Sequence, residues 1–499
     1  MQRKINLNDL IINIFNENWQ KTFVFDAIND VSITYKEFFC KVVLYCKKLN
    51  KIGISSGDIL ALIMNNSLDL MVLYFSSLIA GIRVVPIDPY KGIKEINEII
   101  GKIDGCFIIT DIPIRNSNVK HIIRSKKFMK IFPAKLSVSR NALNIFKKIN
   151  FKKQYLIVFT SGSTGKPKGV IHSFENLINS ALSFGKKFNL SEQNIFYHNF
   201  PMTYMAGILN QILMPFIFRC KIVIGDRFSV ANVNNFWNFP IKYSVNTFWF
   251  NPTTLSLLVN IDRGKQGVEY TTNNSIIGFV GTAPLPNALK QRFEIKYNTT
   301  LYESYGLSET LFVSTETPKS ARNEGSVGKK LDGVEIKFAS DHEILIKSKW
   351  MFLGYTGKEY DGIISNNIFL SGDLGHFDKD NLLHISGRKK DIIIRGGINI
   401  SPRKIENFVS DFGFLEENVI IGIEDEVVGE KIVCFYVSNR LDSKDCENKI
   451  NNAIIKKLGK GYRIDEFVKL LEIPKNINGK IDKLKIKNIQ KNKNNDYTN

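Results

Sequence analysis

Residues 160–169 read TSGSTGKPKG and have the composition of a loop that binds phosphate. Glycine allows the backbone to approach an anion and to adopt positive φ, and consecutive backbone N–H groups can then bind the anion together. The expected phosphate ligands are Thr160, Ser161, Gly162, Ser163, Thr164, Gly165 and Lys168. A flexible Ser/Gly linker is the structural alternative. The loop directly follows the apolar run YLIVF at 155–159, however, and this run predicts a buried strand.

A Walker-type nucleotide site is excluded by the spacing within this loop. That motif requires four residues between its two glycines, followed by Lys and then Ser or Thr. Here only two residues separate Gly162 from Gly165, and Pro167 follows Lys166. Proline offers no hydroxyl to Mg²⁺ and removes a backbone donor. The loop must therefore serve another class of phosphate-binding protein.

Short β-type runs alternate with helical patterns from about residue 30 to residue 300. The expected strands are 58–64, 83–87, 106–110, 156–160, 220–225 and 275–281, and the clearest helices are 35–50 and 70–81. Such alternation predicts an α/β fold of layered, mostly parallel sheets with helices, and a second, smaller α/β unit follows near the C-terminus. We expect an N-terminal body at 1–389, a small C-terminal domain at 390–499 and a disordered basic tail near 486–499.

The bulk composition argues against several classes of protein. The net charge of +20 would suit a nucleic-acid binder, but lysine is spread through predicted helices, loops and tail instead of forming one patch. The longest apolar stretch, 71–85, is too short and too interrupted for a membrane span, and 1–20 lacks a signal-peptide pattern. The six cysteines have neither CxxC nor zinc spacing. We expect a cytoplasmic protein with free thiols, no nucleic-acid partner and no transmembrane segment.

The loop and its neighbours resemble the signatures of the adenylate-forming superfamily, which comprises acyl- and aryl-CoA ligases, luciferases and peptide-synthetase adenylation domains. Residues 155–170, YLIVFTSGSTGKPKGV, resemble its phosphate loop. Its other motifs are VPIDP (85–89), FPMTYMAG (200–207), VGTAPL (280–285), YESYGLSET (302–310), GSVGKK (325–330), MFLGY (351–355), FLSGDLG (369–375), GRKKDIIIRGGINISPRKIE (387–406) and PKNINGK (474–480). The resemblance covers essentially the whole chain and is closest to the acyl-CoA ligases. It implies ATP, Mg²⁺ and CoA as cofactors.

The resemblance implies two half-reactions. A carboxylate attacks the α-phosphorus of ATP to give acyl-AMP and pyrophosphate, and a thiol then attacks the acyl carbon and releases AMP. Lys480 matches the catalytic lysine, which contacts both the carboxylate and the α-phosphate, and its loss should raise the barrier by about 3 kcal/mol or more. Glu309 matches the catalytic Mg²⁺ ligand. Ser308 replaces the usual Thr and keeps a hydroxyl for the phosphates.

Other motif positions match the superfamily's contacts with the nucleoside. The expected adenine and ribose contacts are Gly281, Thr282, Ala283, Tyr305, Asp373 and Arg388. The resemblance implies that Tyr305 stacks on adenine. Asp373 should bind both ribose hydroxyls, because a carboxylate can accept more than one hydrogen bond.

A hinge is implied at Lys390, between the two domains. Rotation of the small domain there would withdraw Lys480 after the first half-reaction. The same rotation would bring Gly396 and Gly397 to the site, where they would leave room beside the thiol arm.

The expected acid-pocket residues are Tyr204, Gly207, Val280 and Ser304. Tyr204 stands where relatives often carry His or another aromatic residue, and it is a candidate gate for the carboxylate. Trp249, Phe279 and Asn251 are further candidate walls, although a core position suits the two aromatic residues equally well. His198 lies nearby in sequence and is expected to be a core or surface histidine.

The combined pattern predicts an ATP-dependent acid–thiol ligase that activates a fatty or aryl acid and transfers it to CoA. The alternative acceptor is a separate acyl carrier protein. Residues 208–220 contain no acidic residue, whereas amino-acid-activating relatives carry an Asp there to hold the α-ammonium. A nucleotide-binding protein that has lost catalysis is a second class, and the intact Glu309, Asp373, Arg388 and Lys480 argue against it.

Overall fold

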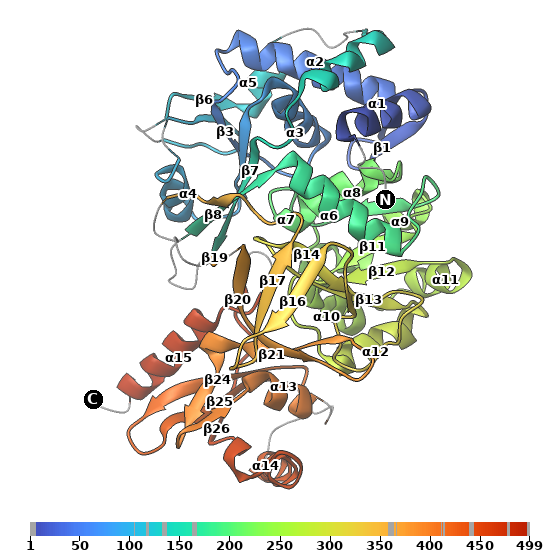
Figure 1. Ribbon diagram of the computed structural model, residues 1–499. Coiled ribbons are helices and arrows are strands. Elements are labelled where there is room, and N and C mark those ends of the chain that lie inside the picture. The colour runs from blue at the N-terminus through green and yellow to red at the C-terminus, as the bar shows by residue number, and fades with distance from the viewer. Residues whose placement is uncertain are drawn as a thin grey trace.

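The computed structural model describes residues 6–103, 105–115, 119–131, 137–161, 167–357, 364–365, 367–410, 412, 415–438, 444–476 and 480–496. Two mainly parallel sheets form the larger part, an antiparallel sheet follows them, and a small C-terminal unit lies at one end of the molecule (Figure 1). The expected α/β class is confirmed.

The phosphate-loop motif belongs to a seven-stranded sheet with the order β18-β8-β7-β4-β3-β5-β6. Its strands are β3 (Ile59–Ile63), β4 (Arg83–Pro86), β5 (Phe107–Thr110), β6 (His121–Arg124), β7 (Gln154–Ser161), β8 (Pro167–Ser173) and β18 (Gly354–Tyr355). Strands β4 to β6 pair in parallel with their neighbours, whereas β7, β8 and β18 form an antiparallel edge. The loop is therefore the connection between two antiparallel strands.

A nine-stranded sheet carries most of the other site motifs. Its strands, in spatial order, are β15 (Lys329–Lys330), β14 (Leu311–Thr315), β13 (Leu301–Leu307), β12 (Ile277–Val280), β11 (Thr247–Phe250), β9 (Ile195–His198), β10 (Lys221–Ile224), β1 (Thr22–Asp26) and β2 (Val31–Thr34). Pairing is parallel from β1 to β13 and antiparallel at both edges. The apolar runs that predicted strands thus lie in the two parallel regions.

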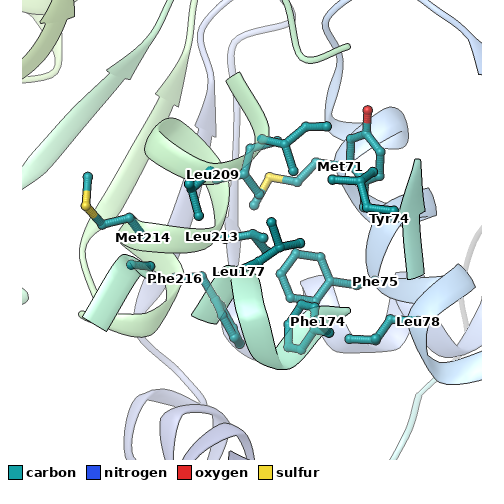
Figure 2. Packing of buried hydrophobic residues seen from close by; sticks show 14 of the residues in the cluster. Met71, Tyr74, Phe75, Leu78, Phe174, Leu177, Leu209, Leu213, Met214 and Phe216 are labelled. Carbon is teal, nitrogen blue, oxygen red and sulfur yellow. The ribbon is translucent and has the colours of Figure 1, made fainter. Parts of the chain in front are cut away.

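Helices pack against both sheets, and their buried residues form one large apolar cluster and two smaller ones with the strands. They are α1 (Leu7–Asn18), α2 (Tyr35–Lys51), α3 (Leu68–Ala80), α4 (Ile93–Ile100), α5 (Ser125–Met129), α6 (Phe174–Lys187), α7 (Met205–Ile208), α8 (Met214–Ile217), α9 (Asn238–Lys242), α10 (Pro252–Asn260), α11 (Gln266–Asn273) and α12 (Asn287–Tyr297). Figure 2 shows side chains of α3, α6 and α8 converging in one apolar cluster. That cluster includes strand residues of both sheets, so burial of this apolar surface stabilises their arrangement.

An antiparallel sheet links the body to the C-terminal unit. Its strands are β16 (Val334–Phe338), β17 (Glu343–Ser348), β19 (Ile364–Ser365), β20 (Ile368–Phe377) and β21 (Leu383–Arg388). The C-terminal unit contains β22 (Ile393–Arg395), β23 (Ile398–Ile400), α13 (Pro402–Ser410), β24 (Glu417–Asp425), β25 (Gly429–Val437), α14 (Lys444–Leu458), β26 (Glu466–Lys469) and α15 (Lys483–Asp496). Two separate apolar clusters fill this unit, so it has a core of its own.

The tail expected to be disordered forms helix α15 as far as Asp496, so that prediction is wrong for residues 486–496. Ile486 is fully buried in the cluster that β24, β25 and β26 form. Gln490, one helical turn later, donates from Nε2 to both carboxylate oxygens of Glu466 at 3.0 and 2.9 Å. Polar composition predicted disorder, but two residues at i, i+4 spacing are enough to attach the helix to the sheet.

Two further expectations concern the whole chain. All six cysteines are free thiols, as their spacing predicted. Within the described ranges, no helix has both the length and the apolar character needed to cross a bilayer.

Candidate active site

The β13–β14 hairpin positions three of the expected site residues. Tyr305 lies on β13, and Ser308 and Glu309 follow in the turn. Glycine is required at Gly306, because a Cβ there would lie 2.1 Å from the carbonyl oxygen of Leu311. This close approach makes the turn tight and fixes where Ser308 and Glu309 leave the sheet.

Asp373 is held between Tyr305 and Arg388. Its side chain is almost fully buried, Tyr305 Oη donates to Oδ2 at 2.8 Å, and Arg388 Nε lies 2.9 Å from Oδ1. Burial, reinforced by the Asp373 carboxylate, raises the pKa of Tyr305 well above its usual value. The phenol therefore stays protonated and donates. Two of the predicted nucleoside contacts, Tyr305 and Arg388, thus bind the carboxylate of the third, Asp373, and each of the three comes from a separate motif.

Glu309 is contacted by Tyr355. The hydroxyl of Tyr355 donates to Glu309 Oε1 at 2.7 Å, and the backbone N–H of Phe352 donates to the Glu309 carbonyl oxygen at 2.9 Å. Among the described residues, no cluster of three or more His, Cys, Asp and Glu could hold a metal by itself. Mg²⁺ bound through substrate phosphates needs only one or two protein carboxylates. The half-buried Glu309 carboxylate fits that requirement.

His172 supports the same turn and was missed by the sequence analysis. It lies on β8, is fully buried, and its Nε2–H donates to the Ser308 carbonyl oxygen at 2.7 Å. Burial lowers the pKa of His172 to about 4, so the imidazole is neutral at physiological pH. A histidine directly after the apolar pair Val170 and Ile171 was the available signal, but it did not show what the residue contacts.

The segment expected to bind adenine follows β12. Gly281 is tightly packed, because a Cβ would lie 2.9 Å from Ser304 Oγ. Thr282 has φ of +75°, a left-handed conformation that is costly for a β-branched residue, and Ala283 follows it half-buried. The Ser304 hydroxyl donates to the Val280 carbonyl oxygen at 3.1 Å, which joins this segment to β13. These residues lie together because β12 and β13 pair in parallel, with Val280 opposite Glu303.

The expected acid-pocket motif forms a tight turn before α7. Tyr204 is half-buried and its backbone N–H donates to the Pro201 carbonyl oxygen at 3.1 Å. Gly207 packs against the same carbonyl, because a Cβ would lie 2.0 Å from it. His198 is fully buried and its Nε2–H donates to the Gly207 carbonyl oxygen at 3.1 Å. Burial lowers the pKa of His198 to about 4, so it is a neutral core residue that braces the turn.

Three candidate pocket walls have structural roles. Trp249 and Phe279 are buried in the main core, with ring centroids 4.9 Å apart. Asn251 caps α10, because its Oδ1 accepts from the Thr254 backbone N–H at 2.7 Å. The Val280 side chain is buried in the second apolar cluster, beside α12.

The phosphate loop is described only at its two ends. Thr160 pairs with Lys168 across β7 and β8, and Ser161 pairs with Pro167. Residues 162–166, which include the expected ligands Gly162, Ser163, Thr164 and Gly165, lie outside the described residues. Lys168 Nζ lies 5.6 Å from the centroid of the Tyr355 ring. The charged end of the loop is therefore adjacent to the partner of Glu309.

Among the described residues, no hydrogen bond or ion pair joins Lys480, Gly396 or Gly397 to the site residues of the body. The backbone of Lys480 exchanges hydrogen bonds with Asn476, and its ammonium has no hydrogen-bond or ion-pair partner among the described residues. Gly396 and Gly397 form an exposed turn between β22 and β23, with φ of +54° and +77°. Lys390 is exposed, two residues after the end of β21. Its neighbour Lys389 pairs with Asp341 and Glu343 of the body.

Comparisons with known proteins match both parts of the chain. The family model of the AMP-binding enzymes matches residues 15–356. The 2-succinylbenzoate–CoA ligase of Oceanobacillus iheyensis is 27% identical over 464 residues, which cover 90% of this chain and 93% of that protein. The malonate–CoA ligase of Arabidopsis thaliana is 26% identical over 66% of this chain and 60% of its own. The structure of o-succinylbenzoate CoA synthetase from Bacillus subtilis with the acyl-adenylate OSB-AMP has a TM-score of 0.80 at 23% identity, covering 96% of this chain and 97% of that one.

Proposed function

Because the chain belongs to the AMP-binding enzyme family, we propose that it is an ATP-dependent ligase that activates a carboxylic acid as acyl-AMP and transfers the acyl group to CoA. The observation that carries the proposal is the buried Asp373 between Tyr305 and Arg388. An oriented carboxylate with two donors around it suits the two ribose hydroxyls of a nucleotide. The Ser308–Glu309 turn continues from the same strand as Tyr305, so the residues for the phosphates and for adenine would share one hairpin.

The first half-reaction joins two anions, and this chain offers cations and donors to offset the charge. Glu309 would hold Mg²⁺, which supplies a Lewis acid for the phosphates. Lys168 and the hydroxyls of Thr160 and Ser161 would bind the phosphates that leave as pyrophosphate. Lys480 would place its ammonium between the acid carboxylate and the α-phosphate.

The second half-reaction requires a different position of the C-terminal unit. We propose that rotation at Lys390 exchanges Lys480 for the Gly396–Gly397 turn, whose left-handed glycines leave room for the thiol arm. We place the boundary between the two domains at residues 389 and 390 as part of this proposal. The core of the C-terminal unit supports it, because a unit with its own core can move as one body.

The acid is proposed to be an aryl or short dicarboxylic acid, with fatty acids as the alternative. The names of the two relatives support this choice, because 2-succinylbenzoate and malonate each carry two carboxylates. Residues 208–220 offer no carboxylate to an α-ammonium group, which argues against amino acids. Relatives named as CoA ligases favour CoA over a carrier protein as the thiol acceptor.

Product analysis tests the proposal. The protein is incubated with ATP, Mg²⁺, CoA and one acid from a panel of aryl, dicarboxylic, fatty and amino acids, and thioester, AMP and pyrophosphate are measured by mass spectrometry. We expect a CoA thioester with an aryl or dicarboxylic acid, in amounts equal to AMP. If the thioester forms on an added acyl carrier protein and not on CoA, the acceptor is the carrier protein. Formation of ADP in place of AMP would contradict the proposed reaction.

A further inference from the structure

Tyr355 lies between the phosphate-loop strand and the expected metal ligand. Its short strand β18 pairs antiparallel with β8, which places Tyr355 opposite Val170. On one side, its ring lies 5.6 Å from Lys168 Nζ. On the other side, its hydroxyl donates to Glu309 Oε1 at 2.7 Å. One residue therefore contacts both groups that would bind the phosphates and their metal.

The backbone around Glu309 is held by other groups. His172 donates to the carbonyl oxygen of Ser308 at 2.7 Å, and the N–H of Phe352 donates to that of Glu309 at 2.9 Å. The backbone carbonyl groups of Ser308 and Glu309 are therefore held by hydrogen bonds that do not involve the Tyr355 hydroxyl. What the hydroxyl can determine is the direction of the Glu309 carboxylate.

Packing fixes the Tyr355 ring and with it the direction of the hydroxyl. The Phe352 ring contacts it edge to face, with centroids 4.7 Å apart and an interplanar angle of 67°. Val170 and Phe369 complete a small apolar cluster around this pair. The donor is thus pre-oriented, and little side-chain entropy is lost when Glu309 accepts the bond.

We propose that Tyr355 is the positioning residue of Glu309, a role that rests on the proposed function. The hydrogen bond occupies Oε1 and orients the carboxylate, so that Oε2 is the oxygen presented to Mg²⁺. Because the same ring contacts Lys168, Tyr355 also fixes the position of Glu309 relative to Lys168, at the end of the phosphate loop. Tyr355 touches neither the metal nor the substrate in this account.

Binding calorimetry separates this role from a general structural one. Tyr355→Phe removes only the hydroxyl, and the affinity for Mg·ATP is compared with the affinity for ATP in excess EDTA. We expect about tenfold weaker binding of Mg·ATP, because a hydrogen bond to a charged group is lost, and metal-free ATP within about twofold of wild type. Equal weakening of both forms, or no weakening of either, would overturn the proposal.

Tyr270→Phe is the matched control. Tyr270 is a half-buried tyrosine on α11, and its hydroxyl donates to the Val245 carbonyl oxygen at 2.8 Å. The variant therefore loses a tyrosine hydroxyl and its hydrogen bond to a neutral acceptor away from the site, and both ATP affinities should stay within about twofold of wild type. A loss specific to Mg·ATP in this variant as well would overturn the assignment to Tyr355.

A double variant shows whether Tyr355 acts through Glu309. Glu309→Gln should weaken Mg·ATP binding by itself, and adding Tyr355→Phe should then cause no further loss. A second tenfold loss in the double variant would overturn the proposal, because Tyr355 would act by another route. If Glu309→Gln binds Mg·ATP as tightly as wild type, the metal assignment is overturned and this inference with it. Thioester formation by the wild-type protein tests the proposed reaction separately from the role of Tyr355.

Discussion

Asp373 and Arg388 face each other directly across the antiparallel β20–β21 pair, and Arg388 Nε lies 2.9 Å from Asp373 Oδ1. Asp373 is almost fully buried, whereas the Arg388 side chain is 47% exposed. The partly exposed guanidinium neutralises the carboxylate from its open side, and Tyr305 donates from the buried side. The carboxylate is thereby fixed in direction before a ligand arrives.

Asp373→Asn should weaken AMP binding about tenfold, because a charged acceptor of the ribose hydroxyls is lost. The ligand 2′,3′-dideoxy-AMP lacks these hydroxyls, so its affinity should change by less than about twofold. Calorimetry with both ligands measures the difference. The exposed Asp332→Asn is the matched control and should bind both ligands as wild type does. Equal weakening of both ligands in Asp373→Asn would contradict the ribose assignment.

The free energy of unfolding should fall as the pH is lowered from about 6.5 to about 4. His172 and His198 are buried with pKa values lowered to about 4, so only the unfolded chain binds these protons within this window. Each histidine contributes a slope of up to about 1.4 kcal/mol per pH unit, and neither contributes above about pH 7. Urea unfolding of wild type and His198→Gln across the window measures the difference in slope. Identical slopes would contradict the neutral, buried histidine.

Lys290→Met should destabilise the fold by about 3 kcal/mol or more. Lys290 Nζ lies 2.9 Å from Glu303 and 2.8 Å from Glu316; both glutamates are buried, with 7% and 0% exposure, and the lysine side chain is 12% exposed. Removing the shared cation leaves two buried carboxylates facing each other. Lys242→Met removes the exposed pair with Asp30 and should cost less than about 1 kcal/mol in the same urea experiment. Equal losses in the two variants would contradict the account.

Thr282→Gly should raise the free energy of unfolding by about 1 kcal/mol, because glycine adopts the φ of +75° without strain. Thr282→Ala should raise the free energy of unfolding by less, since alanine keeps a Cβ in the left-handed conformation. Urea unfolding of both variants measures the difference. A destabilised Thr282→Gly variant would show that the threonine side chain contributes more than its strain costs.

Local patterns predicted the elements well because each depends on its own residues. The run YLIVF became β7, and the helical pattern at 35–50 became α2, which the structure shows to begin at a capping box of Thr34 and Glu37. The meeting of Tyr305, Asp373 and Arg388 was predicted only through the resemblance, because their sequence separation gives no local signal. Family motifs therefore supplied the long-range part of the site.

Features that depend on tertiary contacts could not be read from the sequence. His172 and Tyr355 contact Ser308 and Glu309 only because β8 and β18 pair beside the hairpin. Whether Trp249 lines a pocket or the core depends on rings contributed by other elements. The position of Lys480 depends on the orientation of the C-terminal unit relative to the body, and no local sequence pattern determines this orientation.

Isotope exchange between pyrophosphate and ATP, measured with a substrate acid and without CoA, tests the central claim most directly. The account predicts exchange that requires the acid and not CoA, because acyl-AMP forms before the thiol reacts. Lys480→Ala should slow this exchange by about 100-fold or more. Exchange that requires CoA, or exchange that Lys480→Ala leaves unchanged, would contradict the account.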